Sequence, residues 1–241
     1  MKRIISIFMV LITLGLFSLN AQSIGPDIYF DDEPGTHNMG LTSDGEFYYT
    51  CNGGKTYEGK ISKYSFNGNF MKSYTVELDM RGIMYNPKDQ QLYVNCYDGN
   101  IYKITNLDDG AYQLVYSKLY KNDQASLALD PKGKFLYYLD NGTIRVYDFA
   151  RGTLVDTYYN INCGPDLGSG AYSVAASKKN IITFNSEKQV FYIYDKKGKF
   201  KESIKYEEGD YGFSLTYANG HIFVSKDGDY DMGKWYGYRF K

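Results

Sequence analysis

The feature that most constrains this chain is a sequence pattern that recurs five times, at intervals of about 40 to 47 residues. Each copy contains a short predicted strand in which an apolar or aromatic residue stands at both ends of two variable positions. The five copies are residues 61–64, 101–104, 144–147, 191–194 and 235–238. A small residue that opens an apolar strand precedes each copy, at 40–41, 82–83, 126–127, 173–174 and 214–215. Repeats of this length built from short strands are typical of β-propeller blades.

Each repeat predicts four antiparallel strands, separated by turns rich in Gly, Asn and Asp. In the second repeat we expect an inner strand at 82–85, a second at 91–95, a third at 100–105 and an outer strand at 112–120. No apolar run has the 3.6-residue period and the N-cap of a long helix. The sequence therefore predicts an all-β fold.

The last repeat ends at Lys241, directly after its third strand, so that strand needs a partner from elsewhere. The segment 27–30, just before the first repeat, alternates like an outer strand. We predict a five-bladed β-propeller of four-stranded antiparallel blades, with the N-terminal strand completing the last blade. A misread repeat would instead give four or six blades. The blades are expected at about 37–79, 80–122, 123–164, 165–210 and 211–241, the last together with 27–33.

The first 21 residues have the features of a secretory signal peptide. Lys2 and Arg3 give a positive start, residues 4–17 are almost entirely apolar, and cleavage is expected after Ala21. The apolar run is short for a membrane span, and a buried N-terminal helix is the alternative. We therefore expect residues 22–241 to be a single propeller domain, secreted or periplasmic, with no transmembrane segment in the mature chain.

The charge balance argues against one large class of partner. Lys and Arg number 27 against 28 Asp and Glu, so the chain lacks the basic excess typical of proteins that bind nucleic acid. The 27 Tyr suit half-buried strands. Packing between blades is one explanation for so many tyrosines, and a sugar-binding surface is the other.

Three cysteines in an exported chain cannot all pair within one molecule. Cys51 and Cys96 occupy equivalent positions in the first two repeats, and such points usually lie beyond the ~7 Å Cα separation that a disulfide tolerates. Cys163 lies in a predicted loop. We expect three free thiols, with a Cys51–Cys96 disulfide as the alternative.

Three turn-and-strand segments, 44–49, 98–102 and 130–137, resemble NHL/YVTN-type and related WD40-like propeller repeats. The resemblance covers nearly the whole mature chain and implies the propeller fold. Relatives in that superfamily include bacterial lyases, metal-dependent lactonases and many non-catalytic binding modules. The resemblance therefore implies a fold without selecting a function.

In a propeller, the loops from an outer strand to the next inner strand share one face with those between second and third strands. The predicted face is rich in polar and aromatic side chains, and two enlarged loops, 51–59 and 226–233, become neighbours on closure. We predict that it binds a ligand, although solvated turn residues are the alternative. The candidate ligand-binding residues are Asn38, Tyr57, Asp79, Arg81, Asp123, Gln124, Tyr172, Asp210, Tyr211 and Tyr230.

Catalytic motifs are few in this sequence. His37, expected near Glu33 or Asp210, is the candidate general base. The second histidine, His221, is expected on the opposite face. No nucleophile elbow, zinc-protease helix or phosphate-binding loop is present in the sequence.

A partial calcium-loop pattern occurs near the C-terminus. Asp227, Asp229 and Asp231 match its first half, but Tyr238 stands where a bidentate Glu should follow. We therefore expect no cofactor, with Ca²⁺ held by these aspartates as the alternative.

Taken together, these patterns predict a secreted or periplasmic binding or interaction module that recognises a protein, peptide or glycan on the channel-mouth face. The alternative is a small propeller enzyme of the lyase or lactonase kind, with a divalent cation at the central channel and His37 as base.

Overall fold

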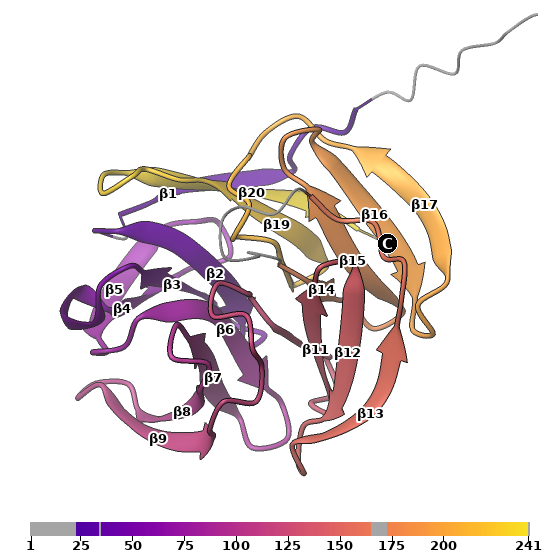
Figure 1. Ribbon diagram of the computed structural model, residues 1–241. Helices are drawn as coiled ribbons and strands as arrows, with labels where there is room; N and C mark the ends of the chain where they lie inside the picture. The colour runs from indigo at the N-terminus through magenta and orange to yellow at the C-terminus, as the bar shows by residue number, and fades with distance from the viewer. Residues whose placement is uncertain (1–22, 34, 165–172, 241) are drawn as a thin grey trace, which may run out of the picture.

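The computed structural model describes residues 23–33, 35–164 and 173–240. These residues form five four-stranded antiparallel sheets, arranged around a common axis as the blades of a propeller (Figure 1). The predicted all-β, five-bladed fold is confirmed, and the helical structure in the described ranges is one 3₁₀ turn, η1 (Thr56–Glu58). None of the described residues belongs to a helix that could cross a membrane. The predicted signal peptide, 1–21, lies outside the described residues.

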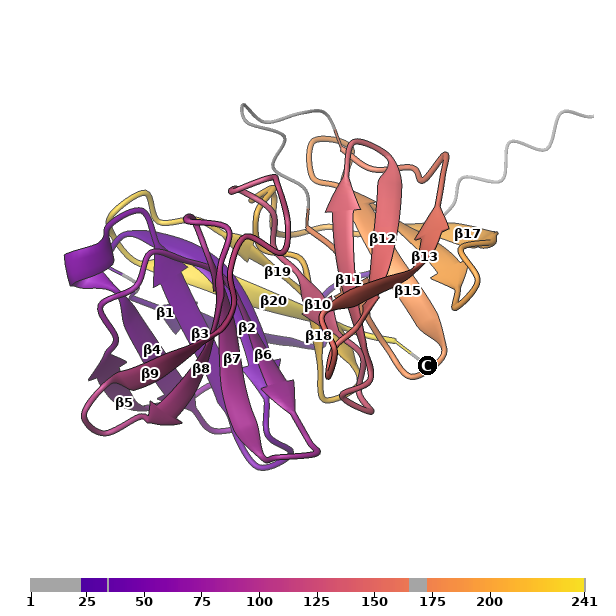
Figure 2. The ribbon, with the colours of Figure 1, turned by 60° about the horizontal axis from the view of Figure 1, so that its bottom comes forward.

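Each blade has an inner, a second, a third and an outer strand in sheet order, and Figure 2 shows β11, β12 and β13 of blade 3 side by side. Blade 1 contains β2 (His37–Ser43), β3 (Tyr48–Gly53), β4 (Lys60–Tyr64) and β5 (Phe70–Thr75). Blade 2 contains β6 (Met80–Asn86), β7 (Gln91–Cys96), β8 (Ile101–Asn106) and β9 (Ala111–Tyr116). Blade 3 contains β10 (Ala128–Leu129), β11 (Phe135–Asp140), β12 (Thr143–Asp148) and β13 (Thr153–Tyr158). Blade 4 contains β14 (Ala175–Ala176), β15 (Asn180–Asn185), β16 (Val190–Asp195) and β17 (Phe200–Lys205). Blade 5 contains β18 (Thr216–Ala218), β19 (His221–Lys226), β20 (Gly233–Arg239) and the outer strand β1 (Ile28–Asp32).

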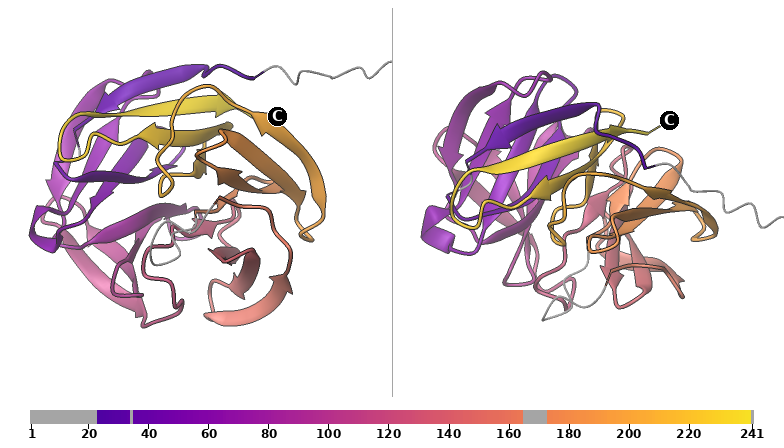
Figure 3. Two further views of the ribbon diagram at one scale, coloured as in Figure 1. Left: turned by 45° about the horizontal axis from the view of Figure 1, so that its top comes forward. Right: turned by 90° about the horizontal axis from the view of Figure 1, so that it is seen from above.

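The N-terminal strand completes the last blade, as the truncated fifth repeat predicts. Strand β1 pairs antiparallel with β20 from Ile28 opposite Gly237 to Asp32 opposite Gly233, and the two strands lie side by side in both views of Figure 3. The Phe30 ring, 5% exposed, packs 4.8 Å from the Tyr64 ring of blade 1. The strand therefore joins the two ends of the ring through backbone pairing and through its side chains.

The outer strand of blade 2 is shorter than predicted. It ends at Tyr116 rather than at residue 120, and Lys118 then adopts a left-handed backbone conformation with φ of 49°. The chain turns inward at this point, which buries Tyr120 against Tyr138 of blade 3 with the ring centroids 5.7 Å apart. The residues after Tyr116 thus place an aromatic ring in the core instead of extending the outer strand.

Many of the tyrosines pack between blades. The hydroxyls of Tyr138 and Tyr194 accept hydrogen bonds from the backbone N–H groups of Asn122 and Asn162, at 2.9 and 2.7 Å. Both amides lie in the segment that leads into a blade, so each tyrosine fastens a connection while its ring fills the core. This dual use of ring and hydroxyl supports packing between blades as one reason for the high tyrosine content.

The three cysteines are free thiols, as expected. Cys51 and Cys96 are both 2% exposed and belong to the apolar cluster between blades 1 and 2. Burial raises the pKa of both thiols. Neither is therefore suited to act as a nucleophile, because the thiolate is the reactive form.

Candidate functional site at the upper face

The two faces of the propeller carry different loops. The upper face is the side on which the inner strands begin, at His37 in blade 1 and Met80 in blade 2. It carries the connections between blades and the enlarged loops 54–59 and 227–232. The lower face carries the turns between the inner and second strands, for example 130–134. The strand order of a propeller thus places the predicted ligand-binding loops that the structure describes on the upper face.

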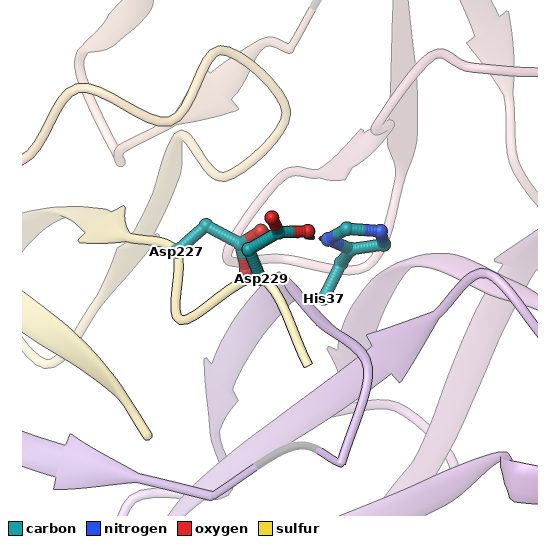
Figure 4. Close-up of side chains that lie close together, drawn as sticks. All are labelled: His37, Asp227 and Asp229. Carbon is teal, nitrogen blue, oxygen red and sulfur yellow. Dashed lines mark hydrogen bonds and ion pairs between the residues drawn. The ribbon is translucent and has the colours of Figure 1, made fainter. Parts of the chain in front are cut away.

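His37 and two aspartates meet on the upper face, where blade 1 adjoins blade 5. The side chains of His37, Asp227 and Asp229 offer ligand atoms that all lie within 4.8 Å of one another, and Figure 4 shows them pointing together. The Nδ1 atom of His37 lies 2.6 Å from Oδ2 of Asp227. The other carboxylate oxygen of Asp227 accepts the backbone N–H of Asn38 at 2.9 Å. Asp227 is therefore fixed on two sides, while Asp229 is exposed.

This arrangement changes the expected partner of His37. The predicted loop positions pointed to Glu33 or Asp210, whereas the carboxylate in contact with the ring is Asp227. The reason is that the loop after β19 folds back over the start of β2 when the ring closes. Asp231, the third aspartate of the partial calcium pattern, is not part of the group, and its Oδ1 accepts the N–H of Met232 at 2.8 Å.

Two tyrosines enclose the His37 ring. Tyr211 stacks on it with centroids 6.0 Å apart and an interplanar angle of 20°, and Tyr230 meets it edge-on at 4.9 Å. Burial, and then the negative charge of Asp227, raise the pKa of Tyr211. Tyr211 is therefore a neutral wall of the site, while Tyr230 is half exposed and accessible to a ligand.

A lysine joins the two enlarged loops. The Nζ atom of Lys55 lies 5.0 Å from the ring centroid of Tyr230 and 6.0 Å from that of Tyr57, and it pairs with Glu58 at 3.1 Å. Tyr57 is 71% exposed. The two loops thus present a continuous surface of aromatic rings around a cation. Lys55 was missed from the sequence because a lysine in a Gly-rich turn is usually a solvated residue.

Arg81 and Asp79 lie beneath this surface and hold it in place. Arg81 is 7% exposed, and one of its terminal nitrogens, NH2, lies 3.2 Å from Oδ2 of Asp79. The other oxygen of Asp79 accepts the N–H of Gly54 at 2.7 Å. A Cβ at Gly53 would lie 2.1 Å from the carbonyl oxygen of Met80, so the start of the loop is pressed against β6. The structure therefore gives both predicted residues an anchoring role.

The remaining candidates lie apart from this group or deeper in the fold. Asn38 is fully buried, and its Nδ2 donates to Asp32 at 3.1 Å. Asp123 and Gln124 lie in the connection into blade 3, and no described contact joins them to His37. Asp210 is exposed, and its backbone N–H bonds to Ser225. Tyr172 lies outside the described residues.

The comparisons with known proteins bear on the fold. No protein-family model matches the sequence, and no curated protein matches it. Among solved structures, a glutaminyl cyclase from Myxococcus xanthus is similar, with a TM-score of 0.63 and 10% identity over 90% of this chain and 98% of that one. Apo AztD from Citrobacter koseri aligns with a TM-score of 0.43 and 13% identity over 73% of this chain and 49% of that one.

The similarity to the cyclase supports the propeller fold. At 10% identity it shows the fold alone, and propeller folds carry unrelated functions. The NHL/YVTN repeat type stays a prediction, because no family model matches it.

Proposed function

We propose that this chain is a binding module that holds a segment of a protein or peptide on its upper face, where the loops of blades 1 and 5 meet. The observation that carries the proposal is the group formed by Tyr57, Lys55, Tyr230, Tyr211 and His37. Two rings are accessible, a cation lies between them, and a half-buried His37–Asp227 pair forms the adjoining wall. Tyrosine supplies large contact area at low entropic cost, which is why protein interfaces are enriched in it.

The rigidity of the surface supports the same proposal. Asp79 and Arg81 fix the loop of blade 1, and the His37–Asp227 contact fixes that of blade 5. A surface held in place before binding loses less conformational entropy when a ligand arrives. Met232, 52% exposed on the same loop as Tyr230, adds an adaptable apolar contact.

A displayed peptide library and a glycan array, both probed with the mature chain, test this proposal. We expect peptides to be selected, and Tyr57→Ala with Tyr230→Ala to weaken their binding tenfold or more, equal to about 1.4 kcal/mol. The matched control is Tyr29→Ala with Tyr112→Ala, at 64% and 42% exposed on the outer strands β1 and β9. Selection of glycans alone would mean that the partner is a glycan and not a peptide. Equal losses in both double variants would place the surface elsewhere.

We also propose that the protein works outside the cytoplasm, in the periplasm or beyond the cell. The support is the charged start and the apolar run at 4–17. N-terminal sequencing of the protein from its native source tests this, with Gln22 expected as the first residue. A mature protein that begins at Met1 would contradict it.

A second candidate function rests on the His37–Asp227–Asp229 group. One imidazole nitrogen and two carboxylates suit Zn²⁺ or another transition metal better than Ca²⁺, which prefers oxygen ligands alone. The 2.6 Å contact between His37 and Asp227 would have to open, because two ligands of one zinc ion lie about 3 Å apart or more. Such an ion would support the alternative of a small metal-dependent enzyme. Metal analysis after dialysis against zinc tests it, with stoichiometric metal in the natural chain and loss in His37→Ala expected.

A further inference from the structure

A separate cavity lies on the lower face, between blades 3 and 4. It has a volume of 540 Å³ and is bounded by the turns 130–134 of blade 3 and 177–179 and 196–199 of blade 4. Five lysines and two aspartates line it: Lys132, Lys134, Lys178, Lys196, Lys197, Asp130 and Asp156. The chain as a whole has a net charge of −1, so this excess of cations is a local feature. Within the described ranges, none of the five lysines takes part in an ion pair.

Lys196 distinguishes the cavity from a solvated lysine cluster. Its Nζ is buried, yet it has no hydrogen-bond partner among the residues that the structure describes. It lies 4.7 Å from the ring centroid of Tyr137, which is itself 2% exposed. A buried ammonium group normally has an acceptor, because losing hydration without compensation is costly. Burial accordingly lowers the pKa of Lys196 to about 8.

The carboxylates nearby do not supply that acceptor. Asp130 directs Oδ1 to the backbone N–H groups of Lys134 and Phe135, at 2.6 and 2.9 Å, which closes the turn of blade 3. Asp156 is exposed on β13, and its Oδ1 accepts the N–H of Thr157. Asp130 attracts the Lys196 ammonium without hydrogen bonding to it, so the ammonium has no acceptor among the described residues.

The walls of the cavity are held rigidly. The hydroxyl of Tyr158 donates to the carbonyl oxygen of Lys196 at 2.9 Å, which ties blade 3 to the last turn of blade 4. Gly198 has φ of +76°, and a Cβ there would lie 2.4 Å from Cγ of Tyr158. Phe135, Val146 and Val155 add apolar lining. A concave, largely preformed site with a few aligned polar groups is typical of small-ligand binding.

We propose that this cavity binds a small organic anion, whose phosphate or carboxylate group accepts hydrogen bonds from the Lys196 ammonium at the inner end. The four rim lysines neutralise the remaining charge, and the Tyr137 and Phe135 rings with the two valines contact the body of the ligand. The volume suits a molecule of the size of a sugar phosphate or sugar acid. The site is distinct from the upper face and does not depend on its function.

Isothermal titration calorimetry with four probes tests the proposal on the mature chain. The probes are inorganic phosphate, glucose 6-phosphate, glucuronate and, as the neutral control, glucose. We expect binding of at least one anionic probe and none of glucose. Preference for glucose 6-phosphate over glucuronate identifies a phosphate site, and the reverse identifies a carboxylate site. Absence of binding for all three anions at millimolar concentration would overturn the proposal.

Two variants locate the binding. Lys196→Met keeps the length of the side chain and should lower affinity tenfold or more without lowering the melting temperature, because it removes a buried unpaired charge. The control is Lys88→Met, in the turn between the inner and second strands of blade 2 on the same face. If Lys196→Met fails to fold, the double variant Lys132→Met with Lys178→Met should also weaken binding, since it removes rim charge alone. Unchanged affinity in the folded Lys196→Met variant, or in the rim variant, would overturn the assignment.

Discussion

Two buried charged side chains in this propeller, Asp32 and Lys196, differ in whether they have hydrogen-bond partners. Asp32, at the end of β1, is 2% exposed and accepts three hydrogen bonds, from Tyr64 at 2.5 Å, Trp235 at 2.8 Å and Asn38 at 3.1 Å. The Nζ of Lys196 is also buried and has no hydrogen-bond partner within the described part of the chain. The first charge is satisfied by the two blades that it joins, and the second is left unpaired inside a cavity. The comparison teaches that a satisfied charge holds a fold together, whereas an unsatisfied one retains the capacity to bind.

The largest change in the free energy of unfolding is expected when Asp32 is replaced. Asp32→Ala leaves the indole N–H of Trp235, the amide of Asn38 and the hydroxyl of Tyr64 without their acceptor at the ring closure. Each buried unsatisfied group costs about 1–3 kcal/mol, so the free energy of unfolding should fall by about 3 kcal/mol or more. Urea denaturation measures this. Its matched control is Asp31→Ala, an exposed neighbour on the same strand, expected to change stability by about 0.5 kcal/mol at most. Similar losses in both variants would mean that Asp32 does not hold the closure.

A smaller change, a gain in stability, is expected when Lys196 is replaced. Its pKa is lowered from 10.5 to about 8 by burial, only partly offset by Asp130. The unfolded chain therefore binds more protons than the native one between pH 8 and 10.5, and the lysine destabilises the fold fully below pH 8. At pH 7, Lys196→Met should be more stable than the natural chain by about 2 kcal/mol. The difference should shrink as pH rises from 8 to 10.5, read by urea denaturation at each pH. A constant difference across this window would show that the amine titrates normally.

Asp79 is intermediate between these cases, because its carboxylate is only partly buried and has two partners. Asp79→Ala should cost about 1–2 kcal/mol, since Arg81 stays buried without its acceptor and Gly54 loses its hydrogen bond. Asp123→Ala, in another upper-face connection, should be nearly neutral. Thermal unfolding compares the two variants, and equal melting temperatures would refute the anchoring role.

Much of this architecture can be predicted from sequence because it is repeated. Five copies of one pattern give the blades, and a last copy without an outer strand identifies β1 as its partner. Burial at strand starts is harder to predict, since Asn38 and Arg81 look like loop residues and are enclosed by neighbouring blades.

The cavity around Lys196 illustrates what sequence cannot show. Its lysines come from three turns, and in each turn a lysine is ordinarily solvated. Only the packing of blade 3 against blade 4 brings the turns together and leaves one amine buried. The contact between His37 and Asp227 likewise joins residues 190 positions apart, through closure of the ring.

Hydrogen–deuterium exchange with and without the best peptide from the library is the most direct test of the central claim, that the upper face at the junction of blades 1 and 5 is the binding surface. The account predicts slower exchange in 54–59 and 227–232, with little change in the lower-face turns 130–134 and 196–199. Protection confined to the lower-face turns or to the outer strands would contradict it.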